Sequence, residues 1–154
     1  MDESHADDEK NADRKRYVVR FLSEANLIDR DPPDDIDKER PDDKAAVYLY
    51  GAYLDEANLS RVPLQKTNLR GTNLRRADLT GTNFTGADLA EADLTDAKLI
   101  EATLDDADLT GATLEGADLT GATLDHADLT RAKGMTKAKV VKQAKSYNGS
   151  TMPE

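Results

Sequence analysis

The sequence predicts an all-β solenoid, a four-sided parallel β-helix, and three observations lead to this prediction. From residue 47 to residue 131 the sequence repeats every five residues without a slip. A large apolar residue stands at the centre of each repeat, and a small or β-branched residue stands two positions before it. The position between them is most often Asp or Asn. Such regular self-similarity is the signature of a repeat architecture.

The period of five identifies the shape of the coil. It fits neither the 3.6-residue period of an α-helix nor the two-residue period of a flat strand. If the chain turns a corner every five residues, four segments close a square coil and all central residues point inward. Successive coils then stack as parallel strands about 4.8 Å apart. The central residue is Leu at every repeat from 49 to 129 except Phe84, and the predicted structural core includes Leu69, Leu74, Leu79, Phe84, Leu89, Leu94, Leu99, Leu104 and Leu109.

The polar and glycine positions of the repeat predict how each corner is held. A short polar side chain before the central residue can bond a nearby backbone amide and stabilise a turn. Glycine, which tolerates corner dihedral angles, stands two residues after the central residue in several repeats. The inward Thr67, Thr72 and Thr82 are expected to donate to backbone carbonyl groups, because a buried hydroxyl without a partner costs stability. These corner glycines include Gly71, Gly81, Gly86, Gly111, Gly116 and Gly121.

The repeat resembles that of a known family. Residues 87–96, ADLAEADLTD, are similar to the A(D/N)LXX motif of the pentapeptide-repeat family, and the resemblance covers residues 47–131. The resemblance implies a right-handed quadrilateral β-helix whose interior is filled by the central Leu or Phe. It also implies a bacterial origin, since the residues after the repeats are similar to the tails of many bacterial members.

The chain divides into five predicted segments. These are a disordered acidic tail (1–10), an N-terminal helix (11–28), a Pro- and Asp-rich loop (29–46), the β-helix (47–133) and a C-terminal capping helix with its tail (134–154). Because a solenoid exposes strand edges at both ends, both short helices are interpreted as caps. A partner-binding role is the alternative for the first, whose apolar stripe is Val18, Phe21, Leu22 and Ala25. Thr136 is the predicted N-cap of a helix over Lys137 to Ser146.

Residues for catalysis or cofactor binding are scarce. The chain has no cysteine and two histidines, His5 and His126. Neither histidine has a nucleophile at a recognisable spacing, and the glycines recur as corners rather than as a phosphate-binding loop. Stacked Asp105 and Asp125, with His126, would form at most a weak cation site. The sequence therefore predicts a protein that is not an enzyme, with no catalytic residue, no cofactor and no metal.

Charge is distributed unevenly along the chain. The formal net charge is −10, yet residues 77–130 alone contain 13 acidic residues and one lysine, Lys98. Residues 20 apart stack, so Asp88, Asp108 and Asp128 should form one ladder. Asp78 and Asp118, with Lys98 between them, should line the opposite face, and these five Asp residues are the candidate partner-binding faces. A basic collar precedes them, consisting of Arg61, Lys66, Arg70, Arg75 and Arg76, with pairing such as Arg76 beneath Asp96 expected between coils.

These features favour a non-enzymatic scaffold that presents flat acidic faces to an unidentified protein. One alternative is a DNA mimic, since the fluoroquinolone-resistance members of the resembling family occupy the DNA site of gyrase. A second alternative is the soluble part of a membrane-anchored protein. Direct nucleic-acid binding is not expected, because phosphate contacts need Lys and Arg. No segment reaches the roughly 18 apolar residues of a membrane span. A cytoplasmic monomer or homodimer is expected.

Overall fold

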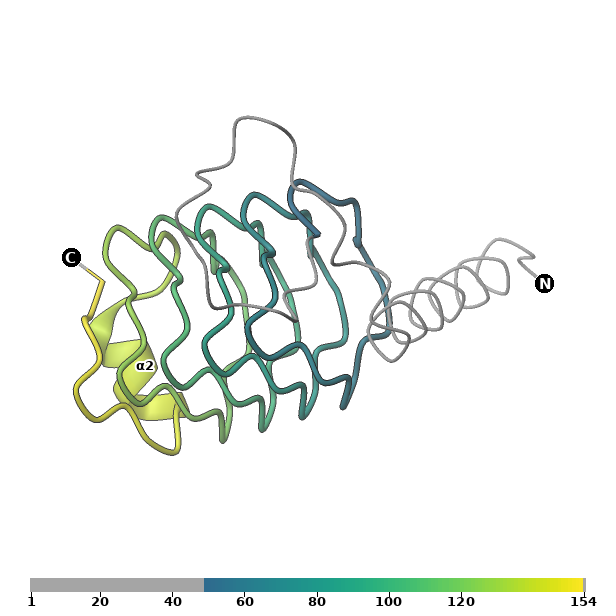
Figure 1. The fold of residues 1–154 in the computed structure, drawn as a ribbon. Coiled ribbons are helices and arrows are strands. Elements are labelled where there is room, and N and C mark those ends of the chain that lie inside the picture. Colours follow the sequence, from purple (N-terminus) through teal and green to yellow (C-terminus); the bar gives the residue numbers. More distant parts are fainter. Residues whose placement is uncertain (1–48, 154) are drawn as a thin grey trace.

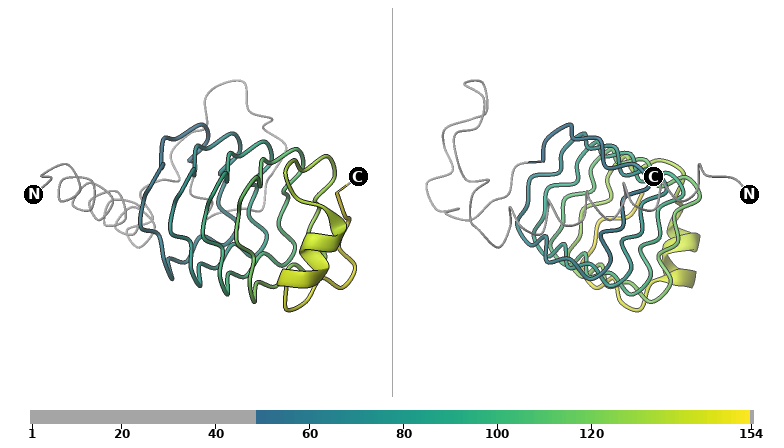
Figure 2. Two further views of the ribbon diagram at one scale, coloured as in Figure 1. Left: turned by 180° about the vertical axis from the view of Figure 1, so that it is seen from behind. Right: turned by 90° about the vertical axis from the view of Figure 1, so that its right-hand side faces the viewer.

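The computed structural model describes residues 49–153, most of which wind into a regular coil (Figure 1). Parallel bridges join residues 20 apart through the coil, for example Asp88 to Asp108 and Asp108 to Asp128. Backbone hydrogen bonds run between neighbouring turns of the coil, and the amide of Leu89 donates to the carbonyl of Asp108 at 2.7 Å. Figure 2 shows the successive turns running parallel to one another along the axis. The predicted 20-residue period and parallel stacking are therefore present.

The sides of the coil are shorter than regular strands. Within residues 49–153 every pairing is an isolated bridge, so one residue per side pairs with the next turn. Each side closes with a tight turn, in which the amide of Ala92 donates to the carbonyl of Leu89 at 3.1 Å. The second corner residue adopts a left-handed conformation, as at Gly111 (φ +68°) and Glu101 (φ +56°). The predicted parallel pairing is present, but the sides are too short to form continuous strands, because two of every five residues are spent on the corner.

The inward residues form one continuous core. The central residue of every repeat from Leu59 to Leu129 is at most 1% exposed, and the small residues two positions earlier are also buried. The hydroxyls of Thr72 and Thr82 donate to the carbonyls of Leu49 and Leu59 at 2.8 and 2.7 Å. Both the predicted core and the predicted threonine bonds are confirmed for these residues. For Thr67 the equivalent carbonyl, that of residue 44, lies outside the described residues.

Bridge residues stack into four ladders, and each ladder marks one face of the coil. We number the faces in chain order. Faces 1 and 3 lie opposite each other, as do faces 2 and 4. Face 1 is Tyr53, Asn73, Asp93, Thr113 and Lys133; face 2 is Asn58, Asp78, Lys98 and Asp118; face 3 is Pro63, Asn83, Thr103 and Thr123; face 4 is Asn68, Asp88, Asp108 and Asp128.

A short helix, α2 (Lys137–Gln143), follows the coil and lies at its C-terminal end (Figure 1). Thr136 is its N-cap, as predicted, and accepts a bond from the amide of Lys139. The helix ends at Gln143 rather than at the predicted Ser146. Beyond it the chain is extended and pairs with the last turn: the amide of Leu124 donates to Ser146, and that of Lys145 to Ala122. The backbone of Lys145 and Ser146 thus bonds the edge of the last turn of the coil instead of continuing the helix.

Three predicted segments lie outside the described residues. These are the acidic tail (1–10), the N-terminal helix (11–28) and the Pro- and Asp-rich loop (29–46). The first two residues of the repeat region, Val47 and Tyr48, are also outside the described part of the chain.

Candidate protein-binding faces

Faces 2 and 4 bring together the acidic residues singled out from the sequence. Asp88, Asp108 and Asp128 follow one another on face 4, one turn of the coil apart. On face 2, Lys98 stands between Asp78 and Asp118. The five carboxylates are half-buried, whereas Lys98 is exposed. Each face therefore presents a straight column of side chains at the spacing of the coil, about 4.8 Å.

One oxygen of each ladder carboxylate holds the adjoining turn. The amides of Ala90, Thr110 and Thr130 donate to Asp88, Asp108 and Asp128 at 3.0, 2.8 and 2.8 Å. The amides of Thr80 and Thr120 donate in the same way to Asp78 and Asp118 at 3.1 and 2.9 Å. These bonds confirm the predicted turn-holding role of the residue before the central Leu.

Hydrogen bonding keeps several of these groups ionised. The hydroxyl and the amide of Thr120 lower the pKa of Asp118, and those of Thr130 lower the pKa of Asp128. Burial acts in the opposite direction on the pKa of Asp93 on face 1, but bonds from Thr95 and Arg75 outweigh it and the pKa falls. Donors favour the charged form of a carboxyl group. Asp118 on face 2 and Asp128 on face 4 are thus held in the charged form by the turns that they stabilise.

Asparagine side chains accept the same turn-holding hydrogen bond elsewhere in the coil. The side-chain oxygens of Asn58, Asn68, Asn73 and Asn83 accept bonds from the amides two residues later at 3.0 to 3.2 Å. These distances match those of the Asp residues, although asparagine carries no charge. This side-chain bond therefore needs an oxygen acceptor and does not need a negative charge.

The basic collar divides into paired and unpaired residues. Arg70 pairs with Glu91 in the next turn at 2.5 Å, and Arg75 pairs with Asp93 at 3.1 Å. Arg76 pairs with Glu56 in the preceding turn at 2.5 Å, rather than with Asp96 as the stacking suggested. Among the described residues Arg61 and Lys66 form no ion pair and are exposed. The collar is therefore mostly a set of ties between turns of the coil.

Asp105, Asp125 and His126 lie near the C-terminal end, where the first two serve the backbone. Asp105 accepts a bond from the amide of Asp125, and Asp125 accepts one from the amide of Asn148 at 2.7 Å. The Asn148 bond lowers the pKa of Asp125. Residues 49–153 contain no group of three potential metal ligands. Asp105 thus holds the next turn of the coil, and Asp125 fastens the chain that follows α2.

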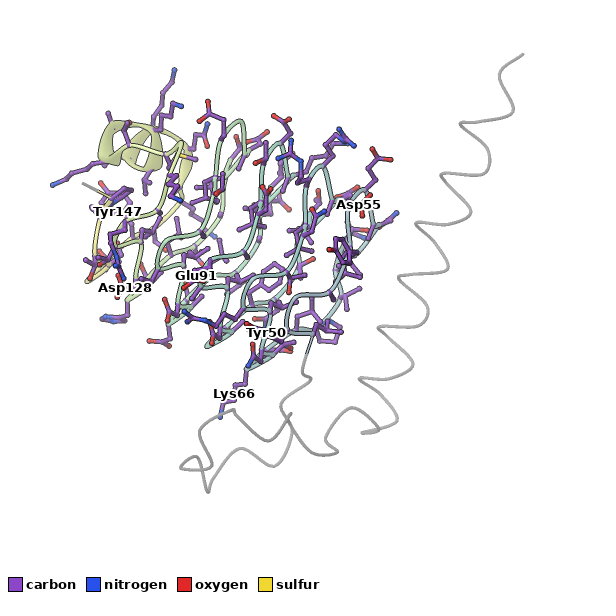
Figure 3. The ribbon with its side chains drawn as sticks, turned by 90° about the horizontal axis from the view of Figure 1, so that it is seen from above. Tyr50, Asp55, Lys66, Glu91, Asp128 and Tyr147 are labelled. Carbon is purple, nitrogen blue, oxygen red and sulfur yellow. The ribbon has the colours of Figure 1, made fainter. Side chains whose placement is uncertain are left out.

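Sequence reasoning missed one set of charged residues. Glu101 and Asp106 are exposed corner residues that lie two turns beyond Arg61 and Lys66. They project from the same two corners of the coil, because residues 20 apart stack. The sequence does contain a signal for this arrangement, because Arg61 and Glu101 are 40 residues apart and so are Lys66 and Asp106. Figure 3 shows Lys66 extending outward from the coil.

Comparison with known proteins agrees with the repeat geometry. A family model described as pentapeptide repeats, with 8 copies, matches overlapping ranges from residue 46 to residue 133. The chain belongs to the pentapeptide-repeat family. Its members form right-handed β-helices and are in general structural or interaction modules. No curated protein matches the sequence.

Several solved structures resemble the chain. A pentapeptide repeat protein of the Arabidopsis thaliana thylakoid lumen is 29% identical over 66% of this chain and 75% of its own, with a TM-score of 0.49. A pentapeptide repeat protein from Nostoc PCC 7120 is 33% identical over 60% of this chain and 84% of its own, with a TM-score of 0.40. QnrB1, a plasmid-mediated fluoroquinolone resistance protein, is 17% identical over 66% and 60%, with a TM-score of 0.37. Across residues 49–153 no helix is long and apolar enough to cross a membrane.

Proposed function

We propose that this chain is a non-enzymatic protein-interaction module that presents the acidic ladder of face 4 to a basic partner protein. The observation that carries the proposal is the equivalence of Asn and Asp in the turns. Asn68 and Asp108 on the same face hold their turns with the same hydrogen bond. The fold therefore does not require the charges of Asp88, Asp108 and Asp128. These three carboxylates, aligned along one face, are then available to bind a partner.

The geometry of the ladder suits a basic surface. One oxygen of each carboxylate is fixed by the turn, so the direction of the other oxygen is set before any partner arrives. A preorganised ligand loses less side-chain freedom on binding, which favours affinity. Complementary charge also increases the association rate and excludes acidic partners. Face 2 presents a weaker version of the same surface, because Lys98 separates Asp78 from Asp118.

The alternative function is DNA mimicry, in which DNA gyrase or another DNA-binding protein is the partner. The observation in its favour is that Asp88, Asp108 and Asp128 lie on the face opposite Asp78 and Asp118, so both sides of the coil are negative. A mimic would need both ladders, whereas a scaffold would need one. Inhibition of gyrase supercoiling by the purified chain would favour the mimic.

The C-terminal segment has a structural role in this proposal. We infer that α2 and the residues after it cap the coil, which leaves the faces as the surfaces for binding. Val140 is fully buried in the core cluster, and the carbonyl of Gln143 accepts a bond from the amide of Gly121. The amides of His126 and Leu129 donate to Asn148 and Thr151.

The decisive experiment neutralises the ladder without disturbing the turns. Asp88, Asp108 and Asp128 are each changed to Asn, and the matched control changes three exposed corner residues, Asp96, Glu101 and Glu115, to Asn, Gln and Gln. The native chain and both variants are used as baits for affinity capture from a bacterial extract, with quantification by mass spectrometry. A partner that the ladder variant loses at least tenfold, and the control keeps, supports the proposal. Equal losses with both variants would show that the overall negative charge, and not the ladder, attracts the partner, and circular dichroism checks the fold of each bait.

A further inference from the structure

Face 3 differs from the other faces in the placement of its charges. Its ladder residues, Pro63, Asn83, Thr103 and Thr123, are uncharged. Two columns of corner residues border it, because backbone bonds stack the corners as they stack the ladders. One column is Arg61, Gly81, Glu101 and Gly121, and the other is Lys66, Gly86, Asp106 and His126. The charges of this face are thus concentrated at its edges.

Four of the bordering residues carry charges that the rest of the described chain leaves uncompensated. Arg61, Lys66, Glu101 and Asp106 are exposed, and none of them forms an ion pair with residues 49–153. All four have the left-handed corner conformation, with φ between 55° and 60°. Arg61 and Glu101 therefore occupy equivalent positions at one corner of the coil, and Lys66 and Asp106 do so at the next. Asp105 and Asp125, which also border face 3, already accept backbone bonds.

The four charges form a rectangle around a neutral row. Arg61 and Lys66 lie on one turn of the coil, Gly81 and Gly86 on the next, and Glu101 and Asp106 on the one after. The basic and acidic rows are therefore about 10 Å apart, two coil spacings. The glycine row leaves room for the basic stems: a Cβ atom on Gly81 would lie 3.3 Å from Cγ of Arg61, and one on Gly86 would lie 3.6 Å from Cγ of Lys66.

We propose that face 3 binds a second copy of this chain in an antiparallel dimer. A two-fold axis that crosses the face between the charged rows, at right angles to the coil axis, reverses the order of the rows and keeps each corner column in place. Arg61 then faces the partner's Glu101, and Lys66 faces the partner's Asp106. The reciprocal contacts are the same by symmetry, so four ion pairs form. A two-fold interface of this kind must be self-complementary, and these residues meet that condition.

Charge complementarity favours a second copy over other occupants. A uniformly basic or acidic partner would be attracted to one row and repelled by the other. A copy in the antiparallel orientation satisfies both rows at once. The interface is small, because it covers one face of a narrow coil, and stable interfaces bury about 800 Å² per partner. Exposed ion pairs contribute about 0 to 1 kcal/mol each and weaken with salt. The dimer is therefore weak and salt-dependent.

Two complementary charge reversals test the dimer. One variant carries Arg61→Glu with Lys66→Glu, and the other carries Glu101→Lys with Asp106→Lys. Both replacement types already occupy left-handed corners in this chain, at Glu56 and Lys66. Sedimentation equilibrium of the full chain at low salt should show a concentration-dependent dimer for the native sequence. Each variant alone should self-associate at least tenfold more weakly, and an equimolar mixture should recover a dimer that is tighter than the native one.

A control separates the proposed contact from general attraction between oppositely charged proteins. The variant Asp96→Lys with Glu115→Lys has the same change in charge, placed at the corner between faces 1 and 2. Its mixture with the Arg61→Glu, Lys66→Glu variant should not recover the tight dimer. A monomeric native chain at millimolar concentration and low salt would overturn the proposal. Dimerisation of the single variants at native strength, or equal recovery with the control, would overturn it as well.

Discussion

The turns before residue 77 and those after it share one backbone and differ in charge. In the earlier part, Asn58, Asn68 and Asn73 accept the bonds that hold the turns. In the later part that role falls mainly to Asp residues such as Asp88 and Asp108. The corner residues change in the same direction, from Arg61 and Arg76 to Glu91, Glu101 and Asp106. The same hydrogen bonds are therefore built from neutral or cationic sequence in one part and from anionic sequence in the other.

This difference separates what the coil needs from what it carries. The coil needs an inward apolar residue and a corner residue that tolerates positive φ, and most repeats add an oxygen acceptor before the inward residue. Those requirements are met equally in both parts. The charge of the outward residues can vary without changing the fold. Its change of sign along the coil axis produces the basic and acidic rows of face 3. Because the fold does not dictate the charge pattern, the pattern is informative about binding.

The largest effect is expected from the shared core, and it tests whether the two parts are equally stable. Leu104→Ala in a middle turn should lower the free energy of unfolding by about 2 to 5 kcal/mol, because it leaves a cavity in a close-packed interior. Leu54→Ala in the first described turn should cost less, since Leu54 is 6% exposed at the end of the core cluster. Urea denaturation of both variants measures the difference. Equal costs would mean that the end of the coil is as tightly packed as its middle.

A smaller effect should separate the acceptor from the charge. Asn68→Ala and Asp108→Ala remove the oxygen that accepts the turn amide, so each should cost about 1 kcal/mol. Asp108→Asn keeps the acceptor and should change the free energy of unfolding by less than about half of that amount. Thermal melts at pH 7 compare the three variants. A cost for Asp108→Asn as large as that for Asp108→Ala would show that the turn needs the charge after all.

The smallest effect concerns pH and is confined to the acidic part. The pKa values of Asp93, Asp118 and Asp128 lie below the ordinary value of 3.8. Groups with a lowered folded pKa contribute stability above that ordinary value and lose it as pH falls through the lowered pKa. Changing all three residues to Asn should therefore flatten the loss of stability between about pH 4 and pH 2. Melting temperatures across this range provide the measurement, and an unchanged acid limb would contradict the assignment.

Much of the architecture was predictable from particular residues. The unbroken spacing of Leu from 49 to 129, with Phe84 among them, predicts a chain that turns every five residues. The ladders of faces 2 and 4 follow from that spacing, because every twentieth residue stacks. Thr136 as the N-cap also followed from local chemistry. The end of α2 did not, because Lys145 and Ser146 bond the last turn of the coil instead of extending the helix.

The sequence by itself determined the period, the inward residues, the corners and the family, because each depends on neighbours within a few residues. Only the tertiary structure decided which charges are engaged and which are free. Arg76 pairs with Glu56, and Arg70 pairs with Glu91, whereas Arg61 and Lys66 form no ion pair with the described residues. An ion pair depends on how long side chains lean across stacked turns, and the spacing along the chain does not specify that direction. The same packing places Glu101 and Asp106 two turns away on the corners of Arg61 and Lys66, where a second copy can reach all four.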